Sequence, residues 1–308
     1  MWSDVSQYQW PQDLRNIIAR LHTLNGTYFP ANSRPLVYHE YEEHGPNIKA
    51  SKYTPLGRVI EFKNHDNLAR VFRGLNGHRL SDLRDYGPKG WGMLATEDAV
   101  VMVDNHDLQR GYAGDLNVTV TFYEPRLLKM TTAFMLAWPY AVPRVMSSYY
   151  WPRKLEVWDR YVDRNSDTGP PHDSGDRIVD VKRNPDLSCD TSQWICEHRW
   201  RPIYNMVRFR NIVGSEPVVQ WWDNTNNQIA FSRGNKAFIA INNDVKSIEM
   251  TNSTGLPGGT YCDIISGGLI DGMCTGRTLT VDSEGTAHIF VDNTWEDPMI
   301  AFHINAKI

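Results

Sequence analysis

The chain has 308 residues, which is more than one ordinary domain and fewer than three. Hydrophobic residues make up 41% and charged residues 22% of the chain, which is the composition of a globular protein with a sizeable core. The net charge of −4 and the lack of a lysine or arginine run argue against nucleic acid or an anionic membrane as partner, and no apolar stretch is long enough to span a bilayer.

The first two-thirds of the chain alternates between helix and strand patterns. In chain order, we expect a helix from Trp10 that Asn25-Gly26 ends, strands over 34–40 and 58–62, a helix over 67–75, a strand over 99–104, a helix over 123–137, a strand over 144–148 and a helix over 194–213. The run 99–104 is almost continuously apolar, as in strands buried on both faces. This alternation predicts βαβ units and a parallel sheet, which is an α/β fold.

The pattern changes after about Gly214. Short apolar runs alternate with turns rich in Asn, Gly and Pro, and we expect strands over 228–231, 237–241, 279–281, 287–291 and 299–304. These features predict an antiparallel β-sandwich. We therefore divide the chain into an α/β domain, residues 1–216, and an all-β domain, residues 217–308.

Two carboxylates follow predicted strands, at the edge of the sheet where a (β/α) barrel carries its active site. Asp107 ends the segment Val103-Asp-Asn-His-Asp107, and Glu40 ends the first predicted strand. Asp107 fits a group that stabilises an oxocarbenium-like transition state, with His106 bonding a sugar hydroxyl, and Glu40 fits a general acid. The same residues also fit structural roles, as a polar strand cap and a solvated surface glutamate.

The cysteines and glycosylation sequons favour an oxidising, secreted setting. The cysteines fall into two local pairs by spacing, neither of which resembles a zinc site: Cys189 with Cys196, and Cys262 with Cys274. Three sequons begin at Asn25, Asn117 and Asn252. The N-terminus has no apolar signal region, which suggests that the beginning of the chain is missing.

Several segments resemble the animal α-amylases. Val103-Asp-Asn-His-Asp107-Leu-Gln-Arg-Gly111 is similar to the fourth signature region of that family. Further similar segments follow in order: Arg126-Leu-Leu-Lys-Met130, Phe134-Met-Leu-Ala137, Arg144-Val-Met-Ser-Ser-Tyr149, Trp151-Pro-Arg153, Trp194-Ile-Cys-Glu-His-Arg-Trp200 and Gly258-Gly-Thr-Tyr-Cys-Asp263. The resemblance implies part of a (β/α)8 TIM barrel, about strands five to eight, followed by an antiparallel Greek-key domain. It also implies that the two cysteine pairs are disulfides.

The resemblance implies the activity and the roles of four residues. The reaction is the endo-hydrolysis of α-1,4-glucosidic bonds in starch, glycogen or maltooligosaccharides with retention, by a secreted enzyme that is monomeric in the family. Glu40 resembles the general acid/base, Asp107 the third carboxylate that holds sugar hydroxyls, and His106 the adjacent substrate-binding histidine. Tyr112 stands in the substrate-binding loop where the family usually has a histidine.

The nucleophile segment of the family reads Arg-x-Asp-Ala-x-Lys-His-x-Trp-Pro. Counting back from Trp10-Pro11 aligns Asp4 with the nucleophile, but Trp2, Gln7 and Tyr8 replace the arginine, lysine and histidine. The sequence shows no strand before Asp4. Asp4 is therefore either a remnant of the nucleophile or an unrelated residue in an altered start.

The resemblance also implies calcium, whose ligands this chain mostly lacks; the backbone carbonyl of Tyr8 is the one that it would retain. The family's chloride site uses two arginines and an asparagine. Asn105 matches the asparagine, but Trp2 and Tyr150 replace the arginines, so we expect no chloride site.

Half of a barrel has two open sheet edges and an uncovered apolar interior. We therefore expect the isolated chain to be poorly stable, prone to aggregate or dimerise, and to have little activity. Two function classes remain. The chain is either a portion of an active α-amylase or a non-catalytic amylase-like protein that binds glucan or is inactive.

Overall fold

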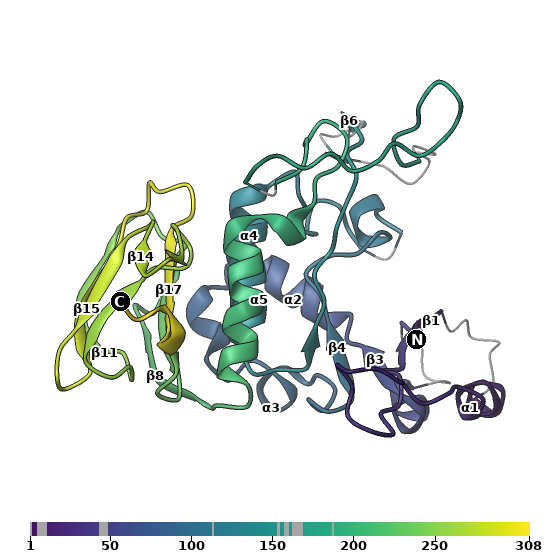
Figure 1. Ribbon diagram of the computed structural model, residues 1–308, viewed down its shortest axis with the longest axis horizontal. Helices are drawn as coiled ribbons and strands as arrows, with labels where there is room; N and C mark the ends of the chain where they lie inside the picture. Colours follow the sequence, from purple (N-terminus) through teal and green to yellow (C-terminus); the bar gives the residue numbers. More distant parts are fainter. Residues whose placement is uncertain are drawn as a thin grey trace. The chain divides into compact units, whose positions relative to one another are not determined.

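The structure of the chain is a computed structural model (Figure 1), which describes residues 2–4, 11–42, 49–112, 114–152, 155–156, 160–161, 169–186 and 188–308. The chain divides into two compact units. The first comprises residues 1–64, 86–101 and 140–144, and the second comprises residues 65–85, 102–139 and 145–308.

The helices are α1 (Pro11–Ala19), α2 (Lys63–Arg73), α3 (Pro88–Trp91), α4 (Pro125–Ala137) and α5 (Arg201–Val213). The strands of the first unit are β1 (Trp2–Asp4), β2 (Tyr38–Glu40), β3 (Arg58–Ile60), β4 (Ala99–Val101) and β5 (Val142–Pro143). Those of the second unit are β6 (Leu155–Glu156), β7 (Arg160–Tyr161), β8 (Val218–Asp223), β9 (Gln228–Arg233), β10 (Ala237–Asn242), β11 (Ile248–Ser253), β12 (Gly259–Cys262), β13 (Leu269–Ile270), β14 (Met273–Cys274), β15 (Thr278–Val281), β16 (Thr286–Val291) and β17 (Met299–His303).

The first unit contains a parallel sheet whose strands lie in chain order, β1-β2-β3-β4-β5. Parallel neighbours need a crossover between them, and the intervening segments supply it with helices such as α2 and α4. The predicted α/β alternation, and with it a partial barrel, is confirmed. Strand β4 is fully buried, as its continuous apolar run predicts.

Two expectations about this sheet were wrong. Trp2–Asp4 does form a strand, β1, which pairs in parallel with β2, so the described sheet has five strands. Three residues are too few for an alternation pattern to reveal a strand in the sequence. The strand expected over 144–148 is not formed. The sheet ends with β5, and Ser148 instead donates its backbone N–H to the carboxylate of Glu197 at 2.7 Å.

A small core supports this sheet. Leu14 of α1 packs with Tyr41, Ala50, Tyr53 and Val59, all of which are buried. The rings of Tyr41 and Tyr53 lie 4.9 Å apart between centroids. Tyr41 therefore belongs to the core of the first unit.

Helices α4 and α5 pack together in the second unit. Every residue of α4 from Leu128 to Ala137 is buried, and α5 buries a stripe that includes Ile203, Met206 and Phe209. Proline occupies the first turn of both helices, where its fixed φ favours helix initiation and its missing N–H costs nothing. The helix expected over 194–213 begins only at Arg201, after the short 3₁₀-helix η6 (Glu197–Arg199).

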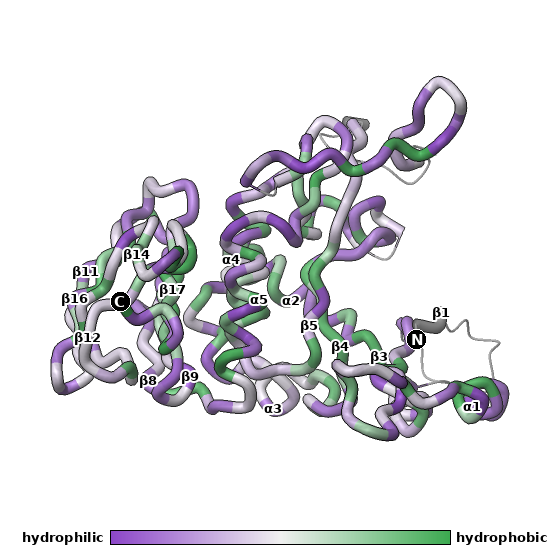
Figure 2. The backbone as a smooth tube through the Cα atoms, viewed as in Figure 1, coloured by the Kyte–Doolittle hydropathy of each residue, from purple (hydrophilic) through white to green (hydrophobic). Residues whose placement is uncertain are grey.

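The C-terminal part of the second unit is an antiparallel β-domain, as predicted. Strands β8, β9 and β10 follow one another in one antiparallel sheet, and β17 returns after a long connection to lie beside β10. Two antiparallel pairs, β11–β16 and β12–β15, provide further strands. One core joins these elements and includes Phe238, Tyr261 and Phe302. Along these strands, hydrophobic green segments alternate with white and purple ones (Figure 2).

Ionic and polar contacts attach this β-domain to the two helices. The guanidinium of Arg233 on β9 donates to the backbone carbonyls of Ala137, Gly214 and Glu216, and so caps the C-terminal ends of α4 and α5. Lys129 of α4 pairs with Glu296 and Asp297. These contacts fix the β-domain against α4 and α5. Across the described part of the chain, no helix has the length and apolarity that crossing a membrane requires.

Candidate functional site

The loop that follows β4 is held by the side chain of Asn105. Its Oδ1 accepts the backbone N–H groups of Asp107 at 3.1 Å and Leu108 at 2.8 Å, at the start of the 3₁₀-helix η5 (Leu108–Arg110). Gly111 ends η5 with a φ of 75°, in the left-handed region that glycine adopts without strain. The chain between β4 and η5 therefore has a defined turn, which sets the position of His106 and Asp107.

His106 and Asp107 both reach solvent from this loop. Their side chains are 59% and 41% exposed, and His106 Nε2 lies 3.7 Å from Asp107 Oδ1. Tyr112 follows η5, and its ring is also exposed. The structure thus presents three sequence-predicted residues on one loop, with a carboxylate, an imidazole and an aromatic ring available to a ligand.

Beneath this loop lies a buried polar network that the sequence analysis did not identify. The side-chain amide of Gln109 donates to Asp104 Oδ2 at 2.6 Å and to Ser148 Oγ at 2.8 Å. The hydroxyl of Ser148 donates in turn to Glu197. All four side chains are buried. The network links η5 to residues 148 and 197 and so holds the loop that carries Asp107.

The two acids of this network are forced towards their neutral forms. Burial, and then the charge of Glu197, raise the pKa of Asp104 to about 8, against the opposing hydrogen bond from Gln109. Burial also raises the pKa of Glu197, although Ser148 stabilises its charged form. The protonation of Asp104, and with it the hydrogen bonding of the network, therefore depends on pH.

Glu40 ends β2 in the first unit, where strands β1 and β2 run in parallel. The register pairs Trp2 with Tyr38, Ser3 with His39 and Asp4 with Glu40. Neighbouring strands lie about 4.8 Å apart, so the backbones of Asp4 and Glu40 are adjacent at the carboxyl ends of their strands. A retaining glycosidase needs two carboxyl groups about 5–5.5 Å apart, and this register brings two acidic residues to neighbouring positions.

Arg110 of η5 contacts two aromatic rings. The guanidinium of Arg110 lies 4.3 Å from the ring centroid of Trp151 and 5.5 Å from that of Tyr149, and it donates to the hydroxyl of Tyr149 at 2.6 Å. Tyr150, which stands at a chloride-ligand arginine of the resembled family, is 42% exposed, and its neutral ring offers no cation to an anion.

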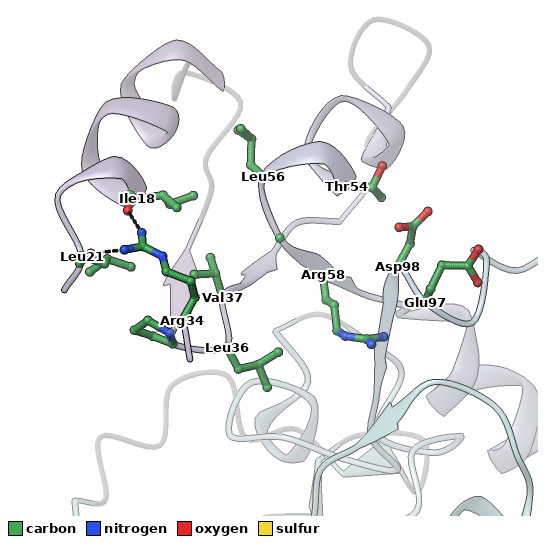
Figure 3. Close-up of a pocket in the computed structure, with 12 residues that line it drawn as sticks. Ile18, Leu21, Arg34, Leu36, Val37, Thr54, Leu56, Arg58, Glu97 and Asp98 are labelled. Carbon is green, nitrogen blue, oxygen red and sulfur yellow. Dashed lines mark hydrogen bonds between the residues drawn. The ribbon is translucent and has the colours of Figure 1, made fainter. Parts of the chain in front are cut away.

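A pocket of about 530 Å³ lies at the amino ends of the parallel strands, whereas Glu40 lies at the carboxyl end of β2 (Figure 3). It is lined by residues that precede or begin β2, β3 and β4, including Val37, Arg58 and Asp98. Active sites of (β/α) barrels lie at the carboxyl ends of the strands. This pocket at the amino ends therefore does not contain the candidate catalytic residues.

Both cysteine pairs form disulfides, Cys189–Cys196 and Cys262–Cys274, with Cα atoms 6.0 and 5.4 Å apart. Tyr8, the expected calcium ligand, lies outside the described residues. Within the described ranges, no three His, Cys, Asp or Glu side chains are grouped so that they could hold a metal ion. The described residues therefore do not fit a calcium site built from acidic side chains.

Comparison with known proteins shows which proteins the chain is similar to. The family "Alpha amylase, C-terminal all-beta domain" matches residues 220–305. An α-amylase from Acarus siro is 52% identical over 99% of this chain, and one from Dermatophagoides pteronyssinus is 51% identical over 99%. The chain is homologous to animal α-amylases over nearly its whole length. It spans 58% and 61% of the length of these two α-amylases and corresponds to their C-terminal portion.

Solved α-amylase structures share the fold. The crystal structure of a variant of α-amylase I from Eisenia fetida in complex with maltohexaose matches with a TM-score of 0.86 and 45% identity. The match covers 96% of this chain and 59% of that α-amylase. The wild-type Eisenia fetida α-amylase I matches with the same TM-score and 46% identity. The predicted partial barrel and C-terminal β-domain agree with these relatives.

Sequence reasoning identified the loop residues but missed the residues that hold them. Asp104 and Glu197 both lie within segments that resemble the family, yet neither carried a signal of its own. One clue was present, because Asp104 directly follows the apolar run 99–103 and a carboxylate there has little access to water. Its partners, Ser148 and Glu197, are distant in the sequence and were recognisable only after folding.

Proposed function

We propose that this chain carries part of the active site of an α-amylase that hydrolyses α-1,4-glucosidic bonds of starch, glycogen and maltooligosaccharides with retention. The observation that carries this proposal is the β1–β2 register, which pairs Asp4 with Glu40 at the carboxyl ends of adjacent parallel strands. In the proposed reaction Glu40 protonates the leaving-group oxygen, and Asp4 attacks the anomeric carbon. Glu40 then takes a proton from the water that releases the product.

In this proposal, three residues of the loop after β4 bind the sugar. Asp107 accepts hydrogen bonds from ring hydroxyls, and these strengthen as the ring flattens towards the transition state. His106 bonds a neighbouring hydroxyl. Tyr112 offers an exposed ring to the apolar face of a glucose unit. The turn that Asn105 holds supports these roles, because it fixes the backbone from which all three side chains project.

A second candidate function is that of a non-catalytic glucan-binding protein. The exposed His106, Asp107 and Tyr112 favour it, since sugar binding needs these groups but no nucleophile. Trp2, in place of an arginine beside Asp4, also favours it. This candidate predicts retention of the chain on a starch gel without release of reducing ends.

The test is the release of reducing ends from soluble starch by the purified chain, beside Glu40→Gln. Glu42→Gln is the matched control, because it makes the same change two residues beyond the end of β2. Hydrolysis that Glu40→Gln abolishes and Glu42→Gln preserves supports the enzymatic proposal. Equal activity in all three proteins contradicts the role of Glu40. Starch retention without hydrolysis in any of them favours the binding protein.

We further propose that residues 1–216 and 217–308 are the two domains and that the protein works outside the cell. The two disulfides support an oxidising compartment. Calcium, if the complete enzyme binds it, takes most of its ligands from residues other than those described. We expect no chloride site, because Trp2 and Tyr150 bring no positive charge to pair with Asn105.

A further inference from the structure

The three glycosylation sequons lie in different structural settings. Asn25, Gly26 and Thr27 occupy an exposed loop between α1 and β2. Asn117 lies in a turn of the loop between η5 and α4, and Asn252 lies within strand β11. A sequon needs both its asparagine amide and its third-position hydroxyl available to the transferase, so these settings separate the three candidates.

The Asn25 loop is fixed at its base and open at its tip. The backbone N–H of Leu24 donates to the carbonyl of Ser33 at 2.8 Å, which closes the loop. Arg34 donates to the carbonyls of Ile18 and Leu21 and ties the base to the end of α1 (Figure 3). Among the described residues, neither the Asn25 nor the Thr27 side chain has a recorded hydrogen-bond partner. Both reactive groups of this sequon are therefore presented to solvent.

The same loop exposes two aromatic rings beside the sequon. Tyr28 is 93% exposed and Phe29 is 49% exposed. The two residues are adjacent in sequence, and a group that covered their rings would remove apolar surface from water. A sugar ring has an apolar face that packs on an aromatic ring, so a glycan on Asn25 suits these neighbours.

The folded structure withholds the other two sequons. Thr119 is 1% exposed, and its hydroxyl donates to the carbonyl of Asp115, while the Asn117 amide donates to the Asp115 carboxylate at 2.8 Å. Thr254 is fully buried and donates to the carbonyl of Gly285 at 3.0 Å. In both sequons, the hydroxyl that the transferase needs is part of the folded structure.

We propose that Asn25 carries an N-linked glycan and that Asn117 and Asn252 do not. This proposal rests on the proposed passage of the protein through the secretory pathway. The donor is an oligosaccharide linked to a lipid diphosphate. The amide nitrogen of Asn25 attacks C1 of its first sugar, the C1–O bond to the diphosphate breaks, and the nitrogen loses one proton. The glycan then covers the rings of Tyr28 and Phe29.

The test is expression of the full chain behind a secretory leader in insect cells, followed by intact mass measurement before and after peptide N-glycosidase. The wild type should carry one glycan, which the enzyme removes to leave an aspartate at position 25. Asn25→Gln and Thr27→Ala should both lose the entire glycan mass, whereas Thr27→Ser should keep it because serine preserves the sequon. Asn117→Gln and Asn252→Gln should leave the mass of the glycan unchanged.

Two results would overturn the proposal. One is an unmodified wild type from cells in which a co-expressed reporter glycoprotein is fully glycosylated. The other is a glycan that survives in Asn25→Gln. Because the leader supplies entry to the secretory pathway and the readout is mass, neither result depends on starch hydrolysis, so this proposal and the proposed enzymatic function fail separately.

Discussion

The buried carboxyl of Asp104 should make the stability of the folded chain depend on pH. Asp104 is 5% exposed, and its pKa rises from 3.8 to about 8 on folding because of burial and the nearby Glu197. An acid whose pKa is raised in the folded state binds a proton there that the unfolded chain has released. The stabilisation is therefore complete below pH 3.8 and is lost as pH rises through about 8.

The size of this effect follows from the two pKa values. Each unit by which a pKa differs between two states corresponds to about 1.4 kcal/mol. The folded chain should therefore lose about 1.4 kcal/mol of unfolding free energy per pH unit between about pH 4 and pH 8, and on the order of 5 kcal/mol in all, from this group alone.

Asp104→Asn isolates this contribution, because asparagine keeps an oxygen that accepts from Gln109 but cannot titrate. Urea unfolding of both proteins at several pH values should give a difference in free energy that changes by about 1.4 kcal/mol per pH unit. Glu249→Gln, on the exposed face of β11, is the matched control. Parallel stability curves for wild type and Asp104→Asn would refute the reasoning.

Three further predictions concern the β-domain. Burial, and then the charge of Arg208, lower the pKa of His303 to about 4, so its contribution is present above pH 6.5 and lost as pH falls through about 4. Between pH 6.5 and pH 4, the unfolding free energy of the wild type, measured with urea, should therefore fall by roughly 3 kcal/mol more than that of His303→Gln. Arg233→Met should lower the unfolding free energy by about 3 kcal/mol, because the buried carbonyl of Ala137 and the partly buried carbonyls of Gly214 and Glu216 lose their donor, and a value near zero would contradict the capping role. Replacing Cys262 and Cys274 by serine should cost roughly 3 kcal/mol by thermal unfolding, and an unchanged midpoint would exclude a stabilising role.

The fold could be predicted from the sequence where the signal is local. The apolar run 99–104 and the helix pattern over 123–137 lie close to β4 and α4, because both segments are buried and therefore rich in apolar residues. The antiparallel strands after Gly214 were recognisable from turns and short apolar runs. Boundaries were less accurate, since the helix expected from Trp194 begins at Arg201, where Pro202 favours the first turn.

By itself, the sequence determined the alternation of strands and helices, the change to a β-domain, the two local cysteine pairs and the candidate residues Glu40, His106 and Asp107. These features depend on the spacing of residues along the chain. Only the tertiary structure decided that Trp2–Asp4 pairs with β2 and that Asp104 shares a buried network with Glu197. Strand register, burial and the electrostatics of buried charges depend on neighbours that are distant in sequence, and those neighbours meet only when the chain folds.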